Sequence, residues 1–405
     1  MRILKYISRL ILLFSLVACQ ADREPQAIDL SQLSWDQVVE KGQSQKLSMM
    51  MWKGDPKINA YMQNYIKPHV KEKYNIELEI VSGQGNTLVQ SLMNEIQADV
   101  DQSQIDLVWI NGETFYQLRQ IDALFGPWID KAPHAKLIDF DNPFIGKDFQ
   151  QDIEGYEMPW GNVQMTLIYN SDQVQDLPQT RSELLTFVKS HPGKFTFDHH
   201  FTGLTFMKSL LIDIAGQEEL AGDFDADKYE KFSADLFAYL NKLKSYLWRK
   251  GEVFPEDVAQ MHQLFAAGEL WFTMSNNDAE VDNKISEGLF TKDARAYVPD
   301  FGSIQNSHYL GIPRKSAHQY SAMLVINEMI SPAAQLHKMQ PEVWGDGSVL
   351  SPEKLSETMQ EKWKNTRMRT NAPPRSVIQK KALQELAPEY MIRLADDFQE
   401  KILQQ

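Results

Sequence analysis

The chain is organised around residues 105–113, which read IDLVWINGE. In this stretch a short apolar run ends abruptly in polar residues, as is typical of a strand that is buried on both faces of a sheet. Helix-like patterns lie on either side of it, and strands that alternate with helices predict a parallel sheet. Ligands of such sheets meet the loops at the carboxyl ends of the strands. We therefore expect Asn111, Gly112 and Glu113 to stand at the mouth of a site.

Two similar units precede this stretch along the chain. An apolar strand over residues 46–51 ends at Trp52 and Lys53, and an alternating strand over residues 76–81 runs into a glycine-containing loop with Asn86. Three strand–loop–helix units in succession predict an α/β domain with right-handed crossovers.

A second set of strand and helix patterns begins after residue 163. Predicted strands at 194–197 and 270–274 end shortly before Thr202 and before Asn277 and Asp278. Each again precedes a helical pattern, so we expect a second α/β unit that is built like the first.

Length and composition narrow the class of protein. A chain of 405 residues is long enough for two or three domains. Hydrophobic residues make up 43% and charged residues 24%, which is normal for a folded soluble protein. The formal net charge of −14 disfavours nucleic acid as a partner, because phosphates require basic patches.

The N-terminus has the pattern of an export signal. Basic residues come first, and a nine-residue apolar run follows that is too short to span a bilayer. The run ends at Cys19, the only cysteine of the chain, in the context of a lipoprotein processing site. We predict a signal peptide over 1–18, lipidation of Cys19, and a tether over 19–33. The protein would be exported to the periplasm or cell surface, and the choice between inner and outer membrane stays open.

The motifs for common enzyme chemistry do not occur in this sequence. There is no G-x-S-x-G, H-E-x-x-H or Walker loop, and no cysteine remains after Cys19 to act as a nucleophile. We predict no cofactor, no bound metal and no catalysis. Two alternatives remain, namely an exported hydrolase that uses Glu113 and Asp278 as acid and base, and an envelope scaffold or sensor protein.

Several short motifs together resemble the family 1 extracellular solute-binding proteins of ABC importers, and most closely their YnjB-like branch. Each motif is weak alone, but their order along nearly the whole chain is specific. They are MWKGDPKIN at 51–59, DLVWINGE at 106–113, FGPW at 125–128, PWG at 159–161, FTG at 201–203 and GIPRKSA at 311–317.

This resemblance implies an α/β fold of the two-lobed, periplasmic-binding-protein-like type II class, a clamshell with crossovers at its hinge. The lobes would comprise residues 34–162 with 300–340, and residues 163–299 with 341–405. The protein would act as a monomer, capture a small solute between its lobes, and deliver it to a permease and its ATPase.

The predicted ligand contacts follow both from the resemblance and from the positions of loops after strands. They are Trp52, Lys53, Asn86, Asn111 and Glu113 on one lobe, and Trp160, Thr202, Asn277 and Asp278 on the other. Aromatic faces beside carboxylates favour an organic cation, such as a thiamine-like or polyamine-like solute. Lys53 and the glycine-containing loops at helix starts would instead suit an anion, and the sequence does not decide between them.

Overall fold

A computed structural model describes residues 30–366 and 369–404 of this protein. The chain divides into two units, Met1–Leu33 and Ser34–Gln405, and the second carries all of the sheets. Cys19 and the predicted signal peptide lie outside the described residues. Among the described residues, no helix is both long and apolar enough to cross a membrane.

The larger sheet contains the three strands that the sequence predicts to be parallel. Strand β1 (Lys46–Met51) pairs in parallel with β2 (Glu77–Ser82) and with β3 (Leu107–Ile110). The fourth neighbour, β10 (Ser303–Gly311), runs antiparallel to β3, so the sheet is mixed. Strands β6 (Glu157–Gln164) and β11 (Ala382–Leu383) both pair with β10. We call the part built on this sheet the first lobe.

Helices cover both faces of this sheet, as an α/β layer requires. Asp55 caps the first of the helices that follow β1, because its carboxylate accepts hydrogen bonds from the N–H groups of Lys57 and Ile58. The helices of the first lobe are α1 (Trp35–Gly42), α2 (Pro56–Tyr61), α3 (Lys67–Tyr74), α4 (Gly85–Gln97), α5 (Gly112–Gln120), α11 (Gln319–Met329) and α12 (Pro332–Lys338), with a π-helical turn over Met62–Ile66.

The smaller sheet differs from the prediction that the second unit is built like the first. Its central strand β7 (Thr166–Asn170) is antiparallel to both β8 (Phe272–Ser275) and β9 (Ala294–Tyr297). The predicted strand at 194–197 is wrong as well, because these residues pair with no strand. Antiparallel strands need no helical crossover between neighbours, so the alternation of strand and helix does not reveal their direction. We call the part built on this sheet the second lobe.

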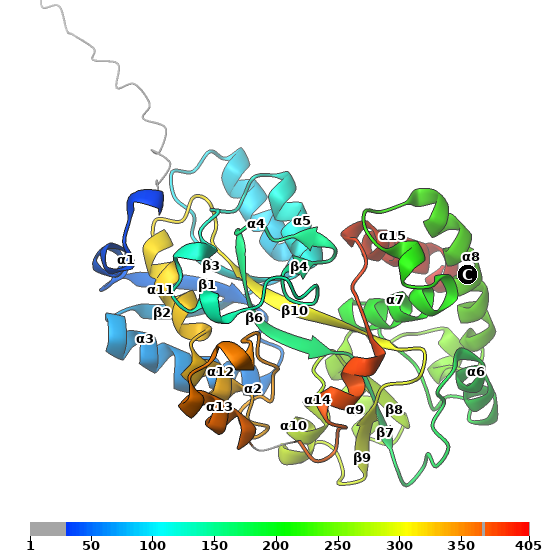
Figure 1. The fold of residues 1–405 in the computed structure, drawn as a ribbon. Helices are drawn as coiled ribbons and strands as arrows, with labels where there is room; N and C mark the ends of the chain where they lie inside the picture. The colour runs from blue at the N-terminus through cyan, green and yellow to red at the C-terminus, as the bar shows by residue number, and fades with distance from the viewer. Residues whose placement is uncertain (1–29, 367–368, 405) are drawn as a thin grey trace, which may run out of the picture. The chain divides into compact units, whose positions relative to one another are not determined.

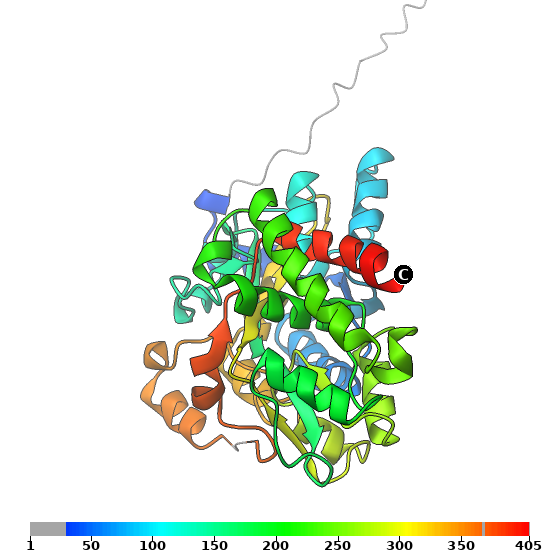
Figure 2. The ribbon, with the colours of Figure 1, turned by 90° about the vertical axis from the view of Figure 1, so that its right-hand side faces the viewer.

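Helices also surround the smaller sheet. Helix α7 (Phe201–Ala215) is almost completely buried, and it packs against α8 (Ala226–Lys244) and the C-terminal helix α15 (Pro388–Phe398). Figure 2 shows these helices together on one side of the molecule, α7 and α8 in green and α15 in red. The remaining helices are α6 (Arg181–Ser190), α9 (Val258–Ala266), α10 (Glu280–Ser286), α13 (Glu357–Lys364) and α14 (Arg375–Ile378).

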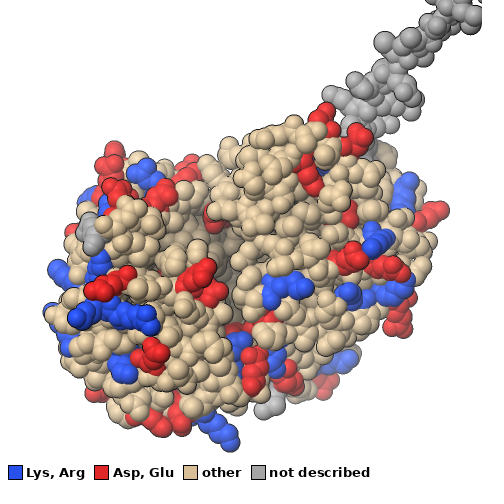
Figure 3. Space-filling model, turned by 180° about the vertical axis from the view of Figure 1, so that it is seen from behind, with Lys and Arg blue, Asp and Glu red and all other residues tan. Residues whose placement is uncertain are grey.

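The two lobes are joined through a central pair of long strands. Strands β6 and β10 pair along most of their length and run between the larger and the smaller sheet (Figure 1). Strand β7 follows β6 after one residue, so the chain passes from one sheet directly into the other. Figure 3 shows a furrow on the opposite face, between the part with the larger sheet and the part with the smaller one. This is the two-lobed α/β arrangement that the sequence predicts.

Candidate functional site

The polar end of β3 begins helix α5, as expected. Asn111 occupies the N-cap position in an extended conformation, and its Oδ1 accepts a hydrogen bond from the hydroxyl of Thr114 at 3.2 Å. Gly112 is the first residue of the helix. A Cβ at this position would lie 2.1 Å from Cδ2 of Phe149, so no larger residue fits without a shift of that ring.

Phe149 reaches Gly112 from a tight hairpin between β4 (Lys147–Asp148) and β5 (Gln151–Asp152). Phe149 and Gln150 form its two-residue turn, with φ of 48° and 65°. Two positive φ values suit the twist of a type I′ hairpin, but they are costly for a side chain as bulky as phenylalanine. The ring of Phe149 is buried in the hydrophobic core of the second lobe, which compensates for this strain. The hairpin therefore connects the start of α5 to the second lobe.

A fully buried ammonium group lies beside this hairpin. Lys208 on α7 donates to both carboxylate oxygens of Glu385, at 2.8 and 2.6 Å, and its Nζ lies 4.1 Å from the centre of the Phe149 ring. Glu385 also accepts hydrogen bonds from the side chain of Asn306 and from the N–H of Leu386. All four acceptor positions of the carboxylate are therefore filled.

Three further acids surround this pair. We call Glu113, Asp148, Glu157, Lys208 and Glu385 the acid–lysine cluster. Burial raises the pKa of Glu113, an effect that the charge of Lys208 opposes. Burial also raises the pKa of Asp148 and of Glu157 well above the usual range, and the charge of Glu385 adds to the rise for Asp148, as that of Asp148 does for Glu157. Within the described residues, Asp148 Oδ2 and both carboxylate oxygens of Glu157 accept no hydrogen bond.

A small cavity adjoins the acid–lysine cluster. It has room for about one water molecule, and its lining includes Phe149, Gln150, Gln305, Asn306 and Glu385. The residues come from the β4–β5 hairpin, the crossing strand β10 and the segment before α15. Gln305 is 7% exposed, and its Oε1 is without a hydrogen-bond partner among the described residues. A solute therefore fits at this cavity only if the surrounding segments move apart.

Trp160, a predicted ligand contact, lies inside the first lobe instead. Its side chain is fully buried, and the rings of Trp109, His308 and Trp344 pack around it at centroid distances of 5.1 to 5.3 Å. The ammonium of Lys338 lies 5.5 Å from the Trp160 ring, so the chain's own lysine already makes the cation–π contact that we expected from a solute. We call the 344–347 segment over this ring the Trp344 loop.

Asp278 is also occupied by partners within the chain. Its carboxylate pairs with the guanidinium groups of Arg369 and Arg375, and it is 2% exposed. Both of its oxygens accept hydrogen bonds from these guanidinium groups, and the side chain is buried, so Asp278 is not placed to contact a substrate. This removes the support for a hydrolase in which Glu113 and Asp278 act together.

The remaining predicted contacts divide into two groups. In the second lobe, Thr202 at the start of α7 accepts a hydrogen bond from Asn276, which joins it to the loop that carries Asn277. Asn277 itself donates to Glu280 and caps the turn that precedes α10. In the first lobe, Trp52 folds over Gly54, while Lys53 and Asn86 are exposed. The two loops of the second lobe are thus held together, whereas those of the first lobe are open to solvent.

Sequence reasoning missed Lys208, Asp148 and Glu385. Lys208 did leave a signal, because it is a lone charge within the apolar run LTFMKSLLI of residues 204–212. A buried charge of this kind requires a partner, and that partner is usually functional or structural. Asp148 and Glu385 lie in polar segments with no such signal.

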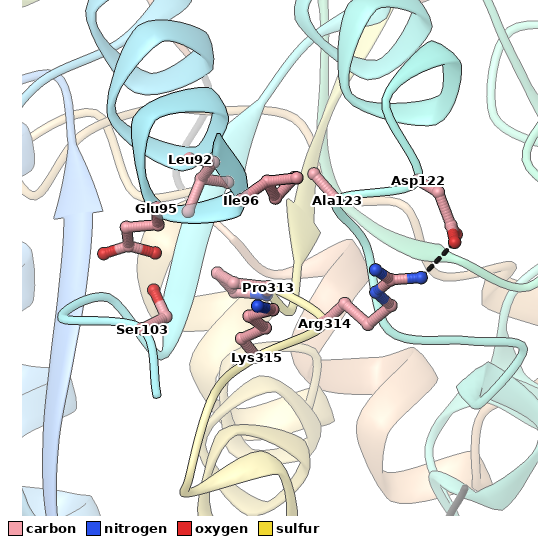
Figure 4. Close-up of a pocket in the computed structure, with 9 residues that line it drawn as sticks. All are labelled: Leu92, Glu95, Ile96, Ser103, Asp122, Ala123, Pro313, Arg314 and Lys315. Carbon is pink, nitrogen blue, oxygen red and sulfur yellow. Dashed lines mark hydrogen bonds and ion pairs between the residues drawn. The ribbon is translucent and has the colours of Figure 1, made fainter. Parts of the chain in front are cut away.

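A second cavity lies at the far side of the first lobe. It also has room for about one water molecule, and it lies between α4 and the segment after β10. Figure 4 shows the ion pair between Arg314 and Asp122 at one edge, with Glu95 and Ser103 at the other. Its charged groups have partners within the chain, so it offers no unsatisfied group to a ligand. Within residues 30–366 and 369–404, no three His, Cys, Asp or Glu side chains are grouped so that they could hold a metal ion.

Comparison with solved structures relates this fold to transport proteins. The spermidine/putrescine ABC transporter substrate-binding protein PotD from Streptococcus pneumoniae is 16% identical and covers 89% of this chain and 98% of its own, with a TM-score of 0.61. The periplasmic binding protein AfuA from Actinobacillus pleuropneumoniae is 11% identical, covers 88% and 98%, and gives a TM-score of 0.62. At these identities the likeness concerns the fold, which is the type II periplasmic-binding-protein fold.

Sequence comparison gives the family. Protein YnjB of Escherichia coli strain K12 is 33% identical over 348 residues, which are 84% of this chain and 88% of that protein. The model of the bacterial extracellular solute-binding protein family matches residues 64–367. Proteins of this family bind solutes and carry out no catalysis, in agreement with the paired state of Asp278. The chain therefore belongs to the bacterial extracellular solute-binding proteins, as its motifs predict.

Proposed function

We propose that this protein is the solute-binding component of an ABC importer, and that its solute is an organic cation with at least one ammonium group. The solute would be held between the lobes, near the start of α5 and the start of α7, and then delivered to a permease and its ATPase. Thiamine-like and polyamine-like molecules have the required charge.

The excess of carboxylates in the acid–lysine cluster carries this proposal. Four acids, Glu113, Asp148, Glu157 and Glu385, stand against the single ammonium of Lys208. The charge of Arg119 also acts on Glu157, but its guanidinium pairs with Glu154 on the surface. Burial favours the neutral form of Glu113, Asp148 and Glu157 by raising their pKa, and a cation that enters this region lets these acids ionise, so it gains more than an anion would. The net charge of −14 also favours the approach of cations over anions, and it acts over longer distances.

The proposal is tested by thermal denaturation of the purified Ser34–Gln405 unit with a panel of small cations, anions and neutral molecules. A ligand that binds only the folded state raises the melting temperature, by an amount that grows with concentration. We expect cations to give the rise. A panel in which only anions or only sugars raise the melting temperature contradicts the cationic solute. Native mass spectrometry of gently purified protein then identifies a co-purified molecule by mass.

Membrane attachment through Cys19 belongs to the same proposal. A lipid on Cys19, after removal of residues 1–18, would keep the protein on a membrane next to its permease. Expression of the full chain and of the Cys19→Ser variant in a bacterium tests this. We expect the unaltered protein in the membrane fraction and the variant in the soluble exported fraction. Equal distribution of both would contradict lipidation at Cys19.

The positions of the lobe boundaries are proposed as well. We place residues 34–162 and 300–340 in the first lobe and residues 163–299 and 341–405 in the second, except that the Trp344 loop and β11 pack on the first lobe. Hydrogen exchange with and without a bound solute would reveal the boundaries, because protection should change at the segments where the chain crosses between lobes.

A further inference from the structure

The acid–lysine cluster has an unfilled donor as well as unfilled acceptors. A lysine ammonium has three N–H groups, and Lys208 uses two of them for Glu385. Among the described residues, the ammonium has as further partners only the thioether sulfur of Met391, at 3.8 Å, and the face of the Phe149 ring. A thioether is a weak acceptor, so this buried donor is poorly satisfied. Leaving a buried charged donor in this state costs free energy, which a stronger acceptor would recover.

The unfilled acceptors come from the other side of the cluster. Asp148 has one oxygen that accepts from the backbone N–H of Gly112 and one, Oδ2, that accepts from no described residue. Both oxygens of Glu157 likewise accept no hydrogen bond from the described residues, although the side chain is fully buried. In the cavity next to the cluster, the buried Oε1 of Gln305 is a further acceptor without a donor. These acceptors belong to the β4–β5 hairpin, to β6 and to β10, whereas the donor belongs to α7 of the second lobe.

The same polarity recurs at a second buried contact between the lobes. Lys284 on α10, in the second lobe, donates to Asp55 at the start of α2, in the first lobe, at 2.8 Å. Burial alone would lower the pKa of Lys284, but the carboxylates of Glu280 and Asp55 raise it, so this lysine stays charged. Here a carboxylate of the first lobe meets an ammonium of the second, as Asp148 and Lys208 do in the acid–lysine cluster, although each lysine also pairs with acids of its own lobe, Lys208 with Glu385 and Lys284 with Glu280 and Glu287.

We propose that the solute carries an acidic group in addition to its ammonium group, and that it is therefore a zwitterion of the amino acid type. Its acidic group accepts from Lys208 of the second lobe, and its ammonium donates to Asp148 and Glu113 of the first. This inference rests on the proposed function and narrows it. A zwitterion satisfies both kinds of unfilled group at once, whereas a diamine places a second positive charge beside Lys208, and a dicarboxylate adds negative charge to an acidic region.

Calorimetric titration with four matched series of linear molecules tests the inference. The series are ω-amino acids, diamines, dicarboxylates and diols with the same numbers of methylene groups, so that they differ in the charge of their ends and hardly in length. We expect an amino acid to bind at least about tenfold more tightly than the diamine and the dicarboxylate of its length, which corresponds to the loss of one charged contact.

The outcomes separate this inference from the proposed function. Diamines that bind as tightly as the amino acids, or more tightly, overturn the zwitterion and leave the cationic solute in place. Dicarboxylates that bind more tightly than the amino acids and the diamines overturn both the zwitterion and the cationic solute. No binding by any amino acid of the series overturns the zwitterion, whichever other molecule binds.

Two sets of variants identify the side chains that bind the ammonium end and the acidic end of the solute. Glu113→Gln should weaken the binding of amino acids and of diamines alike, by about tenfold. It should leave the binding of dicarboxylates unchanged or make it tighter. The control is Glu95→Gln, which removes a partly buried carboxylate from the neighbouring helix α4, at the other cavity. Equal effects of the two variants would contradict a role for Glu113.

The second set concerns Lys208. Loss of Lys208 alone leaves Glu385 buried without its counter-charge and endangers the fold. The double variant Lys208→Met with Glu385→Gln removes both charges, and circular dichroism verifies that it folds. Its preference for amino acids over diamines should fall by about tenfold. A preference that stays unchanged in the folded double variant overturns the assignment of Lys208.

Discussion

Removal of the Lys338 ammonium offers a sharp test of how the first lobe is held together. Lys338 on α12 is fully buried, and its three N–H groups donate to Asp346, to the carbonyl of Trp160 at 2.6 Å and to the carbonyl of Gly347 at 2.9 Å. Asp346 belongs to the Trp344 loop. The lysine therefore holds that loop against β6, and we predict that Lys338→Met strongly destabilises the protein.

The magnitude follows from what the substitution leaves behind. Burial alone would raise the pKa of Asp346, but Lys338 and His308 hold it below the usual range, so the carboxylate is charged. Without Lys338 it keeps His308, whose Nε2 lies 3.2 Å from Asp346 Oδ2, and the charge of Arg375. Breaking a buried ion pair on one side costs about 3–5 kcal/mol. The two carbonyls lose less, because Gln335 still donates to Trp160 and the N–H of Asn162 to Gly347.

The assay is equilibrium unfolding in urea, followed by tryptophan fluorescence, on a double-mutant cycle. Lys338→Met and Asp346→Asn should each lower the free energy of unfolding by about 3–5 kcal/mol. The double variant should lose clearly less free energy of unfolding than the sum of the two single losses, because neither charge is then left alone. We expect a coupling energy of about 2 kcal/mol or more. Costs that add within about 0.5 kcal/mol would refute the ion pair as the cause and would assign the loss to packing among the tryptophans.

Three further predictions concern other parts of the fold. Gly112→Ala should lower the free energy of unfolding by about 1–3 kcal/mol in urea titration, because its Cβ meets the Phe149 ring at about 2.1 Å; a loss below about 0.5 kcal/mol would mean that the ring moves freely aside. Burial raises the pKa of Glu280 to about 7, so between about pH 4.5 and 7 this group alone makes stability fall as pH rises, by on the order of 3 kcal/mol; burial lowers the pKa of His262 to about 4, and its opposite effect between about pH 4 and 6.5 largely cancels that fall in the unaltered protein. Glu280→Gln should remove the fall and uncover the rise from His262, so that the free energy of unfolding of this variant increases by on the order of 3 kcal/mol from about pH 4 to 6.5; a variant profile as flat as that of the unaltered protein would exclude this effect of Glu280. Val108→Asp buries an unpaired carboxylate in β3 and should unfold the first lobe, whereas Glu113→Ala should keep the melting temperature nearly unchanged, and equal melting temperatures of the two would show that the end of β3 is misassigned.

The sequence predicted the elements of the first lobe well, because their signals are local. The apolar run that ends at Ile110 became β3, and the polar residues after it begin α5 at Gly112. Asp55 caps a helix because a carboxylate and a following proline suffice for that role. In the second lobe the direction of the strands was wrong, since direction depends on which strands become neighbours. The alternation of strand and helix is the same in either case.

The candidate site shows the same division between local and long-range information. The sequence by itself determined which loops follow strands, and it identified Asn111 and Glu113 as residues at such a loop. Only the tertiary structure decided which charges are satisfied. It gave Trp160 an internal ammonium from Lys338, and it joined Lys208 to Glu385, a residue 177 positions away along the chain. A strand or a helix cap is set by neighbours in sequence, whereas the partner of a buried charge is set by packing between distant segments, and no local pattern records it.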